Sequence, residues 1–329
     1  MENFGQLFRD FESIKVGVIG DVMLDTYIWG EVERISPEAP VPVVSLHHKE
    51  QRLGGAGNVA LNLQSMGAEA FVLSVTGADD DARCLMNLYA DHGINTAYCF
   101  GSEDRVTTNK TRIISRNQQM MRLDAEITRD LSPLDQKTLL EKFRQFADDV
   151  KPQVVVLEDY NKGVLTEEVI AGVIAICKQA GILTAVDPKR KNFFSYKGVD
   201  IFKPNLKEVR EALNMLSVDV ELHHLEQIHR ELQAILQHRI SLITLSEKGV
   251  FFQKDEEAAI IPSHIRNIAD VSGAGDTVIA VAALVYAARK NVHLMAELAN
   301  IAGGLVCEEV GTAAINPQKL FHECEMLLS

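Results

Sequence analysis

Short runs of β-branched and other apolar residues alternate with amphipathic helical patterns along most of the chain. The run KVGVIGDVMLD at 15–25 predicts a buried parallel strand that carries Asp21 and Asp25 at its carboxyl end. Helical patterns fill several later intervals, as at 58–68 and 167–181. Further strands are predicted at 70–77, 154–160, 183–188, 199–205, 241–249 and 249–254. This alternation predicts an α/β fold, a doubly wound and mainly parallel sheet with helices on both faces.

Two stretches, at about 27–53 and 96–124, break this alternation. The first has three prolines among β-branched residues, and the second is alternating and rich in turn residues. Both patterns predict antiparallel strands that stand outside the main sheet. We therefore expect one domain over 1–329, in which these two insertions form a small β-sheet lid over the crevice at the strand ends.

Charge and cysteine usage narrow the choice of partners. The net charge of −13 disfavours nucleic acid and anionic membranes, because both require basic surface. Five scattered cysteines without CxxC spacing are typical of reduced thiols. The first residues, MENFGQLFRDF, are too charged for a signal peptide, and no apolar run is long enough to span a membrane. We expect a cytoplasmic protein with no nucleic-acid or membrane partner.

The stretch DVSGAGDTVI at 270–279 has the composition of an anion-binding loop. It precedes a long apolar pattern, so the N–H groups of Gly273, Ala274, Gly275 and Asp276 would lie at a helix N-terminus and could hold a phosphoryl group in transit. The Asp276 carboxylate could then accept the proton of an attacking hydroxyl. The alternative is an ordinary glycine-rich turn in which the aspartate is the helix N-cap.

A second glycine cluster, RLGGAGNVALNLQSMG, occupies residues 52–67. Gly54 and Gly55 permit a close approach of the backbone to a ligand, and the Asn58 amide can hold sugar hydroxyls. A tight turn before an amphipathic helix is the alternative.

Together and in this order, the two glycine clusters resemble the two signatures of the ribokinase-like (PfkB) carbohydrate kinases. The resemblance includes GDVMLD, with Asp21, and KPNLKE, with Asn205 and Glu208 in the family's Asn-x-x-Glu motif. In TLSEKG, at 244–249, Ser246 replaces the first glycine of the family's nucleotide-contacting segment. The family implies a ribokinase-like fold, ATP as phosphoryl donor and Mg²⁺ as cofactor.

Longer strings resemble the members of this family that phosphorylate D-glycero-β-D-manno-heptose 7-phosphate at O1. The strings are ISPEAPVPVV, KTRIISRNQQMMRLD, DYNKG and DPKRKNF. In such kinases the product enters ADP-heptose and lipopolysaccharide core synthesis. A nucleotidyltransferase part often follows the kinase, but this chain has no His-x-Gly-His motif, so we expect a stand-alone kinase.

The resemblance also implies a role for each matching residue. Asp276 is the expected base, and the N–H groups of the 273–275 loop are expected to stabilise the phosphoryl group. Sugar hydroxyls are expected to bind Asp21, Gly54, Gly55 and Asn58, and magnesium is expected to bind Asn205 and Glu208, largely through water. Nucleotide contacts are expected from Thr244, Ser246 and Gly249, and a monovalent cation such as K⁺ would bind the carbonyl groups of Asp270 and Ser272.

A phosphorylated substrate requires a cationic pocket in this acidic protein. Among seven candidate cations we expect the contacts from Arg112, Arg122, Lys162 and Lys189, which lie within the heptose-kinase strings and adjoin predicted strand ends or the lid. The remaining candidates are Lys110, Arg116 and Arg190. A small lid needs apolar surface to be stable, so we also expect a homodimer formed through the lid.

Two other functions remain open from the sequence. A different sugar or sugar-phosphate kinase of the same family would keep the fold and Asp276 without the basic pocket. A nucleotide-binding regulatory protein would keep the fold without catalysis, and retention of Asp276 with Asn205 and Glu208 argues against it.

Overall fold

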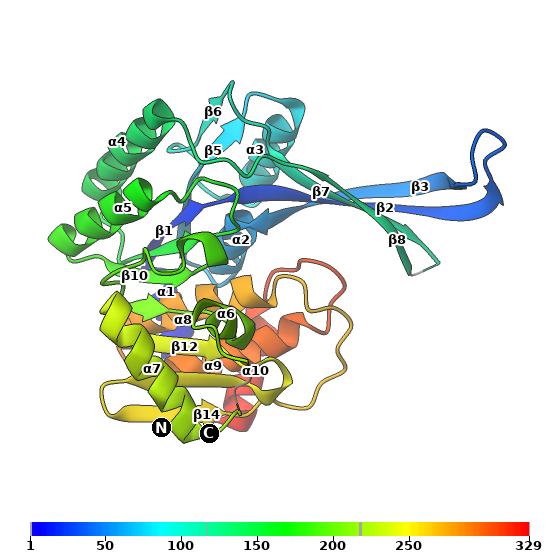
Figure 1. Cartoon of the computed structure of the whole chain (residues 1–329). Coiled ribbons are helices and arrows are strands. Elements are labelled where there is room, and N and C mark those ends of the chain that lie inside the picture. The colour runs from blue at the N-terminus through cyan, green and yellow to red at the C-terminus, as the bar shows by residue number, and fades with distance from the viewer. Residues whose placement is uncertain (1, 117, 217–218, 329) are drawn as a thin grey trace.

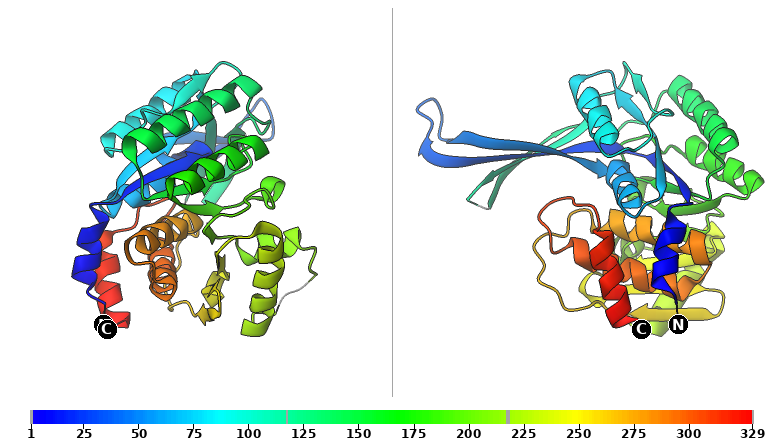
Figure 2. Two further views of the ribbon diagram at one scale, coloured as in Figure 1. Left: turned by 90° about the vertical axis from the view of Figure 1, so that its left-hand side faces the viewer. Right: turned by 180° about the vertical axis from the view of Figure 1, so that it is seen from behind.

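The alternating strands and helices form one large sheet with helices on both faces, as predicted (Figures 1 and 2). The computed structural model describes residues 2–116, 118–216 and 219–328. In the order of the sheet, the eight strands are β14 (Glu257–Ile261), β13 (Val250–Lys254), β12 (Ile240–Thr244), β11 (Ile201–Phe202), β10 (Leu183–Asp187), β9 (Val154–Glu158), β1 (Lys15–Gly20) and β4 (Glu69–Leu73). Adjacent strands pair in parallel from β4 through β12, whereas the pairs that involve β13 are antiparallel.

The two faces of this sheet are packed separately because strand side chains alternate. On β9, Val154 and Val156 face one apolar cluster, and Val155 and Leu157 face the other. The helices of the first cluster are α1 (Phe4–Phe11), α2 (Ala56–Ser65), α3 (Asp80–Asp91), α8 (Ala274–Arg289), α9 (Val292–Val306) and α10 (Pro317–Leu327). The helices of the second cluster are α4 (Pro133–Val150), α5 (Glu167–Ala180), α6 (Leu206–Ala212) and α7 (Leu222–Leu236).

A separate four-stranded sheet projects from the body as an arm, which we call the lid (Figure 1). Its strands, in sheet order, are β3 (Pro42–Gly55), β2 (Val22–Ile35), β7 (Thr108–Ser115) and β8 (Gln118–Ala125). The expectation of purely antiparallel pairing was wrong, because β2 and β7 pair in parallel. Two hairpins laid side by side, β2 with β3 and β7 with β8, produce this arrangement.

The boundaries of the predicted strands also differ near the lid. The expected strand at 15–25 is two strands, since β1 ends at Gly20 and β2 begins at Val22. The start of the second insertion lies outside the lid, because β6 (Phe100–Ser102) pairs with β5 (Val75–Gly77) in a small sheet of its own. Asn117, inside the second predicted lid segment, lies outside the described residues.

Candidate active site

Acidic side chains meet where parallel strands of the main sheet end. Asp21 follows β1, Glu158 ends β9 and Asp187 ends β10, while Asp276 lies in the first turn of α8. Carboxylate oxygens of Glu158, Asp187 and Asp276 lie within 4.8 Å of one another, and all three residues are buried. The carboxyl edge of a doubly wound sheet is where such folds bind ligands, so this is the candidate active site.

The loop before α8 has the geometry of an anion site. Gly273 is the N-cap of α8 and has a φ of +79°, in the left-handed region that favours glycine. A Cβ atom there would lie 2.7 Å from the Asn58 amide nitrogen. The first-turn N–H groups have no partners within the helix and point out of its N-terminus. Because Asp276 lies inside the first turn, the alternative that it is the N-cap was wrong.

Asp276 is buried and held by two hydrogen bonds. Its carboxylate accepts from the Asn58 amide at 2.8 Å and from the Tyr160 hydroxyl at 2.7 Å. Burial raises the pKa of Asp276 to about 6, although both hydrogen bonds act to lower it. The group is therefore ionised at neutral pH and can accept a proton there.

Tyr160 was not predicted as a site residue, although it stands in the DYNKG string. Burial and the nearby Asp276 raise the pKa of Tyr160 well above its usual value, so its hydroxyl stays protonated and donates to the base. No local sequence signal marks this role, because the contact joins a loop after β9 to a helix far along the chain.

The residues predicted to hold sugar hydroxyls have protein partners in the structure. The Asn58 amide donates to Asp276, and its own oxygen accepts from Asn62 at 3.3 Å. Asp21 accepts from the backbone N–H groups of the loop after β9, namely those of Tyr160, Lys162 and Val164, at 2.8 to 3.1 Å. Asn58 thus positions the Asp276 base, and Asp21 positions the loop after β9 that carries Tyr160.

The two glycines at the end of β3 bring the backbone close to acidic groups. A Cβ atom on Gly54 would overlap the Asp25 carboxylate, and one on Gly55 would lie 2.5 Å from the Asp21 carbonyl oxygen. Gly55 has a φ of +57° and is the N-cap of α2. The two glycines therefore have a steric reason within the protein itself, and their binding of a ligand stays a prediction.

The four cations expected to bind a substrate phosphate are each paired with a carboxylate. Arg112 contacts Asp25, Lys162 lies 2.7 Å from Glu126, and Lys189 lies 3.2 Å from Asp187 and 3.0 Å from Glu208. Arg122 pairs with Asp124 on β8, and its side chain is 51% exposed. Burial alone would lower the pKa of Lys189, but the surrounding carboxylates outweigh this and raise that pKa.

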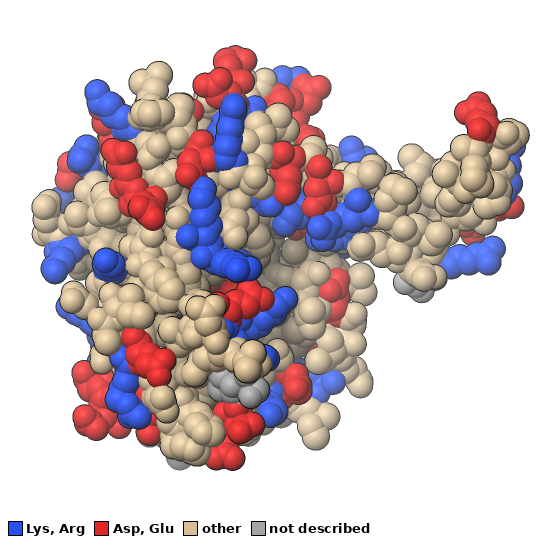
Figure 3. Space-filling model, viewed as in Figure 1, with Lys and Arg blue, Asp and Glu red and all other residues tan. Residues whose placement is uncertain are grey.

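Lys110 differs from these four cations. No ion pair to a described residue occupies its ammonium group, which lies 5.2 Å from the centre of the Tyr160 ring. The hydroxyl of the same Tyr160 contacts Asp276. Burial lowers the pKa of Lys110, which an anionic ligand would reverse. Figure 3 shows Lys and Arg side chains gathered beside the hollow where the lid leaves the body.

Asn205 and Glu208 form a capping box at the start of α6. The Asn205 side chain accepts from the Glu208 N–H, and the Glu208 carboxylate accepts from the Asn205 N–H, both at 2.8 Å. The other Glu208 oxygen contacts Lys189, so this cap faces the acidic cluster. The predicted nucleotide turn lies alongside, since Thr244 forms a bridge with Asn205.

The turn at 244–249 contains the departure from the family pattern. Ser246 has a φ of +57° and Gly249 a φ of +96°, so both occupy the left-handed region. Ser246 therefore adopts the conformation for which the family's glycine is suited. Its carbonyl oxygen accepts from the Gly249 N–H at 3.1 Å, which closes the turn.

The two residues predicted to offer carbonyl groups to a monovalent cation are tied to the same loop. The Asp270 carboxylate accepts from the Ser272 N–H and hydroxyl at 3.0 and 2.8 Å, and from the Gly311 N–H at 3.0 Å. Burial would raise the pKa of Asp270, but these hydrogen bonds outweigh it and lower that pKa.

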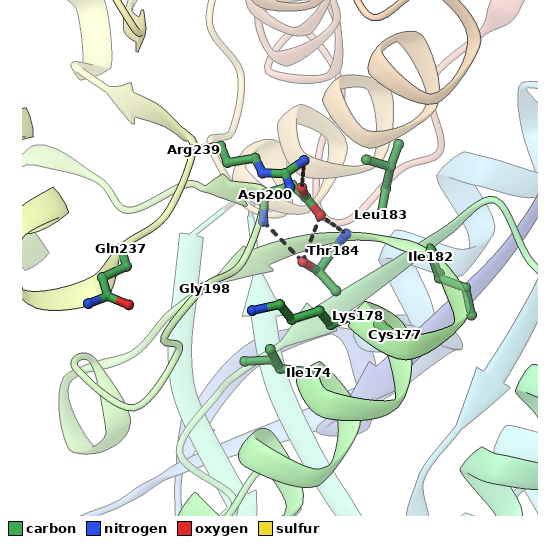
Figure 4. Close-up of a pocket in the computed structure, with 11 residues that line it drawn as sticks. Ile174, Cys177, Lys178, Ile182, Leu183, Thr184, Gly198, Asp200, Gln237 and Arg239 are labelled. Carbon is green, nitrogen blue, oxygen red and sulfur yellow. Dashed lines mark hydrogen bonds and ion pairs between the residues drawn. The ribbon is translucent and has the colours of Figure 1, made fainter.

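A cavity of about 300 Å³ lies at the amino ends of the strands, opposite the acidic cluster (Figure 4). It is lined at the beginnings of β10 and β11, by Leu183 and Asp200 among others. Asp200 is held there by Thr184 and by Arg239 at 3.0 Å. This cavity is separate from the acidic cluster, which lies at the other ends of the strands.

Among the described residues, no helix is long and apolar enough to cross a membrane.

Comparison with known proteins defines the class of this protein. The chain matches the family of pfkB carbohydrate kinases over residues 13–319 and belongs to that family. It is a carbohydrate kinase, and the predicted ribokinase-like fold is confirmed. The structure resembles phosphofructokinase-2 from Escherichia coli in complex with potassium, with a TM-score of 0.78 and 16% identity over 95% of this chain and 99% of the other. Arabidopsis thaliana ribokinase complexed with ribose and ATP has a TM-score of 0.71 at 17% identity, over 94% of this chain and 98% of the other.

Within the family, curated relatives carry the name Bifunctional protein HldE. The chain is 36% identical to that of Geobacter sulfurreducens, over 97% of this chain and 64% of the relative. It is 40% identical to that of Desulfatibacillum aliphaticivorans, over 94% of this chain and 63% of the relative. The chain thus spans less than two thirds of the length of these relatives.

Proposed function

We propose that this carbohydrate kinase transfers the γ-phosphoryl group of ATP to O1 of D-glycero-β-D-manno-heptose 7-phosphate. The observation that carries the proposal is a buried base, Asp276, in the same site as a cation, Lys110, that forms no ion pair with any described residue. The first suits phosphoryl transfer to a hydroxyl, and the second suits a sugar that already carries a phosphate. The product would enter ADP-heptose synthesis for lipopolysaccharide core.

In the proposed reaction, the sugar O1 attacks the γ-phosphorus in line with the leaving ADP oxygen. Asp276 takes the O1 proton as the new P–O bond forms and the bond to the β–γ bridging oxygen breaks, which releases ADP. The N–H groups of the Gly273, Ala274 and Gly275 loop stabilise the charge on the transferring group. Asn58 and Tyr160 hold the base, while Asp21 and the two glycines Gly54 and Gly55 shape the floor of the sugar site.

Two cations belong to the proposal. The donor set of Asn205 and Glu208 suits Mg²⁺ held through water, and this ion would neutralise charge on the ATP phosphates. Thr244, Ser246 and Gly249 would contact the nucleotide. We also assign K⁺ to the carbonyl groups of Asp270 and Ser272, next to the anion loop. Turnover measured over a range of Mg²⁺ concentrations checks the magnesium assignment, and turnover in K⁺ compared with Na⁺ checks the potassium assignment. Activity that does not depend on one of these ions contradicts the assignment of that ion.

The substrate is tested by an assay coupled to ADP release. Heptose 7-phosphate is expected to be turned over with a kcat/KM far above that of ribose, fructose 6-phosphate or unphosphorylated heptose. If an unphosphorylated sugar is the better substrate, the enzyme is a different sugar kinase of this family. If no sugar releases ADP while ATP binds, the regulatory alternative gains support.

We place the reaction in the cytoplasm, where ATP is available, and cell fractionation checks this.

The acid limb of the pH profile is expected to lie near pH 6. The base must be ionised, so kcat falls about tenfold for each pH unit below the pKa of Asp276, which is about 6. The substrate phosphate also titrates near pH 6. Tyr160→Phe separates the two, because it removes a hydrogen bond that lowers the pKa of Asp276 and so moves the limb to higher pH. A limb that stays in place in this variant belongs to the substrate.

We also propose that two copies associate through the lid. The lid exposes six large apolar side chains, those of Ile35, Val41, Leu46, Met120, Met121 and Leu123. Several exposed large apolar side chains on a thin sheet are typical of an interaction site. Leu46→Glu with Leu123→Glu is expected to yield a monomer in sedimentation velocity, while Leu134→Glu, on α4, leaves a dimer intact. A wild-type protein that is monomeric at micromolar concentration contradicts the proposal.

A further inference from the structure

One carboxyl group in the acidic cluster has no partner. Glu158 is fully buried, and neither of its carboxylate oxygens has a hydrogen-bond partner among the described residues. The group faces Asp187 and Asp276, with oxygens of all three within 4.8 Å of one another. An ionised carboxylate in such a place is costly unless it binds a cation or takes a proton.

The nearby cations are committed elsewhere. Lys203 lies 2.7 Å from Asp187, and Lys189 contacts both Asp187 and Glu208. No ion pair joins either ammonium group to Glu158 in the described part of the chain. Their charges act on Glu158 from a distance and lower its pKa, but they are outweighed by burial and by the charges of Asp187 and Asp276.

In the described part of the chain, Lys189 and Lys203 are the only cations whose charges are found to act on Glu158. β1 ends beside it at Gly20, and the carboxylate of the following Asp21 accepts three backbone N–H groups. From α2 and the loop after β9, Asn58 and Tyr160 both donate to Asp276. Burial, together with the charges of Asp187 and Asp276, raises the pKa of Glu158 well above its usual value.

We propose that Glu158 is a positioning residue of this site, held as a neutral carboxylic acid whose proton faces the carboxylates of Asp187 and Asp276. A neutral Glu158 removes one negative charge from the place where the phosphoryl group arrives. Its O–H group also adds a donor beside Asp276, which keeps the base ionised to lower pH. This kinetic consequence rests on the proposed function, whereas the protonation state does not.

Infrared difference spectroscopy on the unliganded protein tests the protonation state. At about pH 8, Asp276 and Asp159 are ionised, because the pKa of each is about 6. The wild-type protein is expected to show the C=O stretching band of a protonated carboxyl group, shifted in D₂O, and Glu158→Gln is expected to lack it. Identical spectra in this region overturn the proposal.

The pH profile of two variants tests the positioning role. Glu158→Leu removes the donor, so the acid limb is expected to move up by about one pH unit. Glu158→Gln keeps a neutral donor of the same shape and is expected to return the limb toward that of the wild type. Should both variants move the limb to lower pH, Glu158 is ionised in the wild type and the proposal fails.

A metal-bound Glu158 is the remaining outcome, and binding of Mn²⁺ detects it. The unliganded wild-type enzyme and Glu158→Gln are expected to bind Mn²⁺ equally weakly. One tight Mn²⁺ site per chain that is lost in Glu158→Gln overturns the proposal in favour of a metal ligand. If heptose 7-phosphate gave no ADP release, the proposed function would fail while the infrared result on Glu158 would stand.

Discussion

Replacing Asp276 with asparagine is expected to lower kcat by roughly 10² to 10⁴, the range typical of a lost general base. The amide keeps the shape of the side chain and can still contact Asn58 and Tyr160, but it cannot accept the O1 proton. ATP binding should change little, because the loop N–H groups and the Asn205 and Glu208 cap remain. Stopped assays of turnover, with calorimetry for ATP, measure the two effects separately.

The matched control for this variant is Asp91→Asn, at the exposed end of α3. It removes the same charge far from the strand ends and should leave kcat unchanged. A loss of ATP binding equal to the loss of turnover in Asp276→Asn would indicate a structural role. Undiminished turnover would exclude Asp276 as the base.

Lys110→Met is expected to lower kcat/KM for heptose 7-phosphate by about 10- to 100-fold. This is the fold-change that corresponds to the loss of one hydrogen bond between charged groups. The methionine keeps the apolar stem over the Tyr160 ring and removes only the ammonium group. The loss should appear mainly in KM and should be small for unphosphorylated heptose, which has no phosphate to bind. Steady-state kinetics with both sugars provide the comparison.

Lys49→Met is the control for Lys110→Met, because Lys49 is an exposed lysine on the same lid. Its kinetics should match those of the wild type with both sugars. An equal loss with phosphorylated and unphosphorylated sugar in Lys110→Met would mean that Lys110 supports the site without binding the phosphate. The phosphate would then bind a cation that first leaves its carboxylate, such as Arg112.

The parts of this molecule that are local in sequence could be predicted, and those that depend on distant contacts could not. The alternating runs predicted the sheet, and the loop before α8 predicted an anion site beside Asp276. Glu158 and Asp187 also lie near the ends of predicted strands, so the rule that ligands bind at strand ends would have identified them. Their mutual contact could not be read from the sequence, because it depends on the order of the strands.

The same distinction applies to the cations. The heptose-kinase strings contain Lys110 beside Arg112, and nothing in the sequence distinguishes the paired one from the unpaired one. The structure separates them, because Arg112 contacts Asp25 while Lys110 lies over Tyr160. The parallel pairing of β2 with β7 was missed for a similar reason, since each hairpin is local but their association is not.

The junction of β1 and β2 has a consequence for how the chain folds. Only Asp21 separates the two strands, and β2 must then find β7 across a long stretch of intervening chain that includes β4 and α3. Closing so long a loop is entropically costly until the main sheet has formed. The lid is therefore expected to assemble last during refolding and to open first on denaturation, which exposes its apolar strands while the kinase core is still intact.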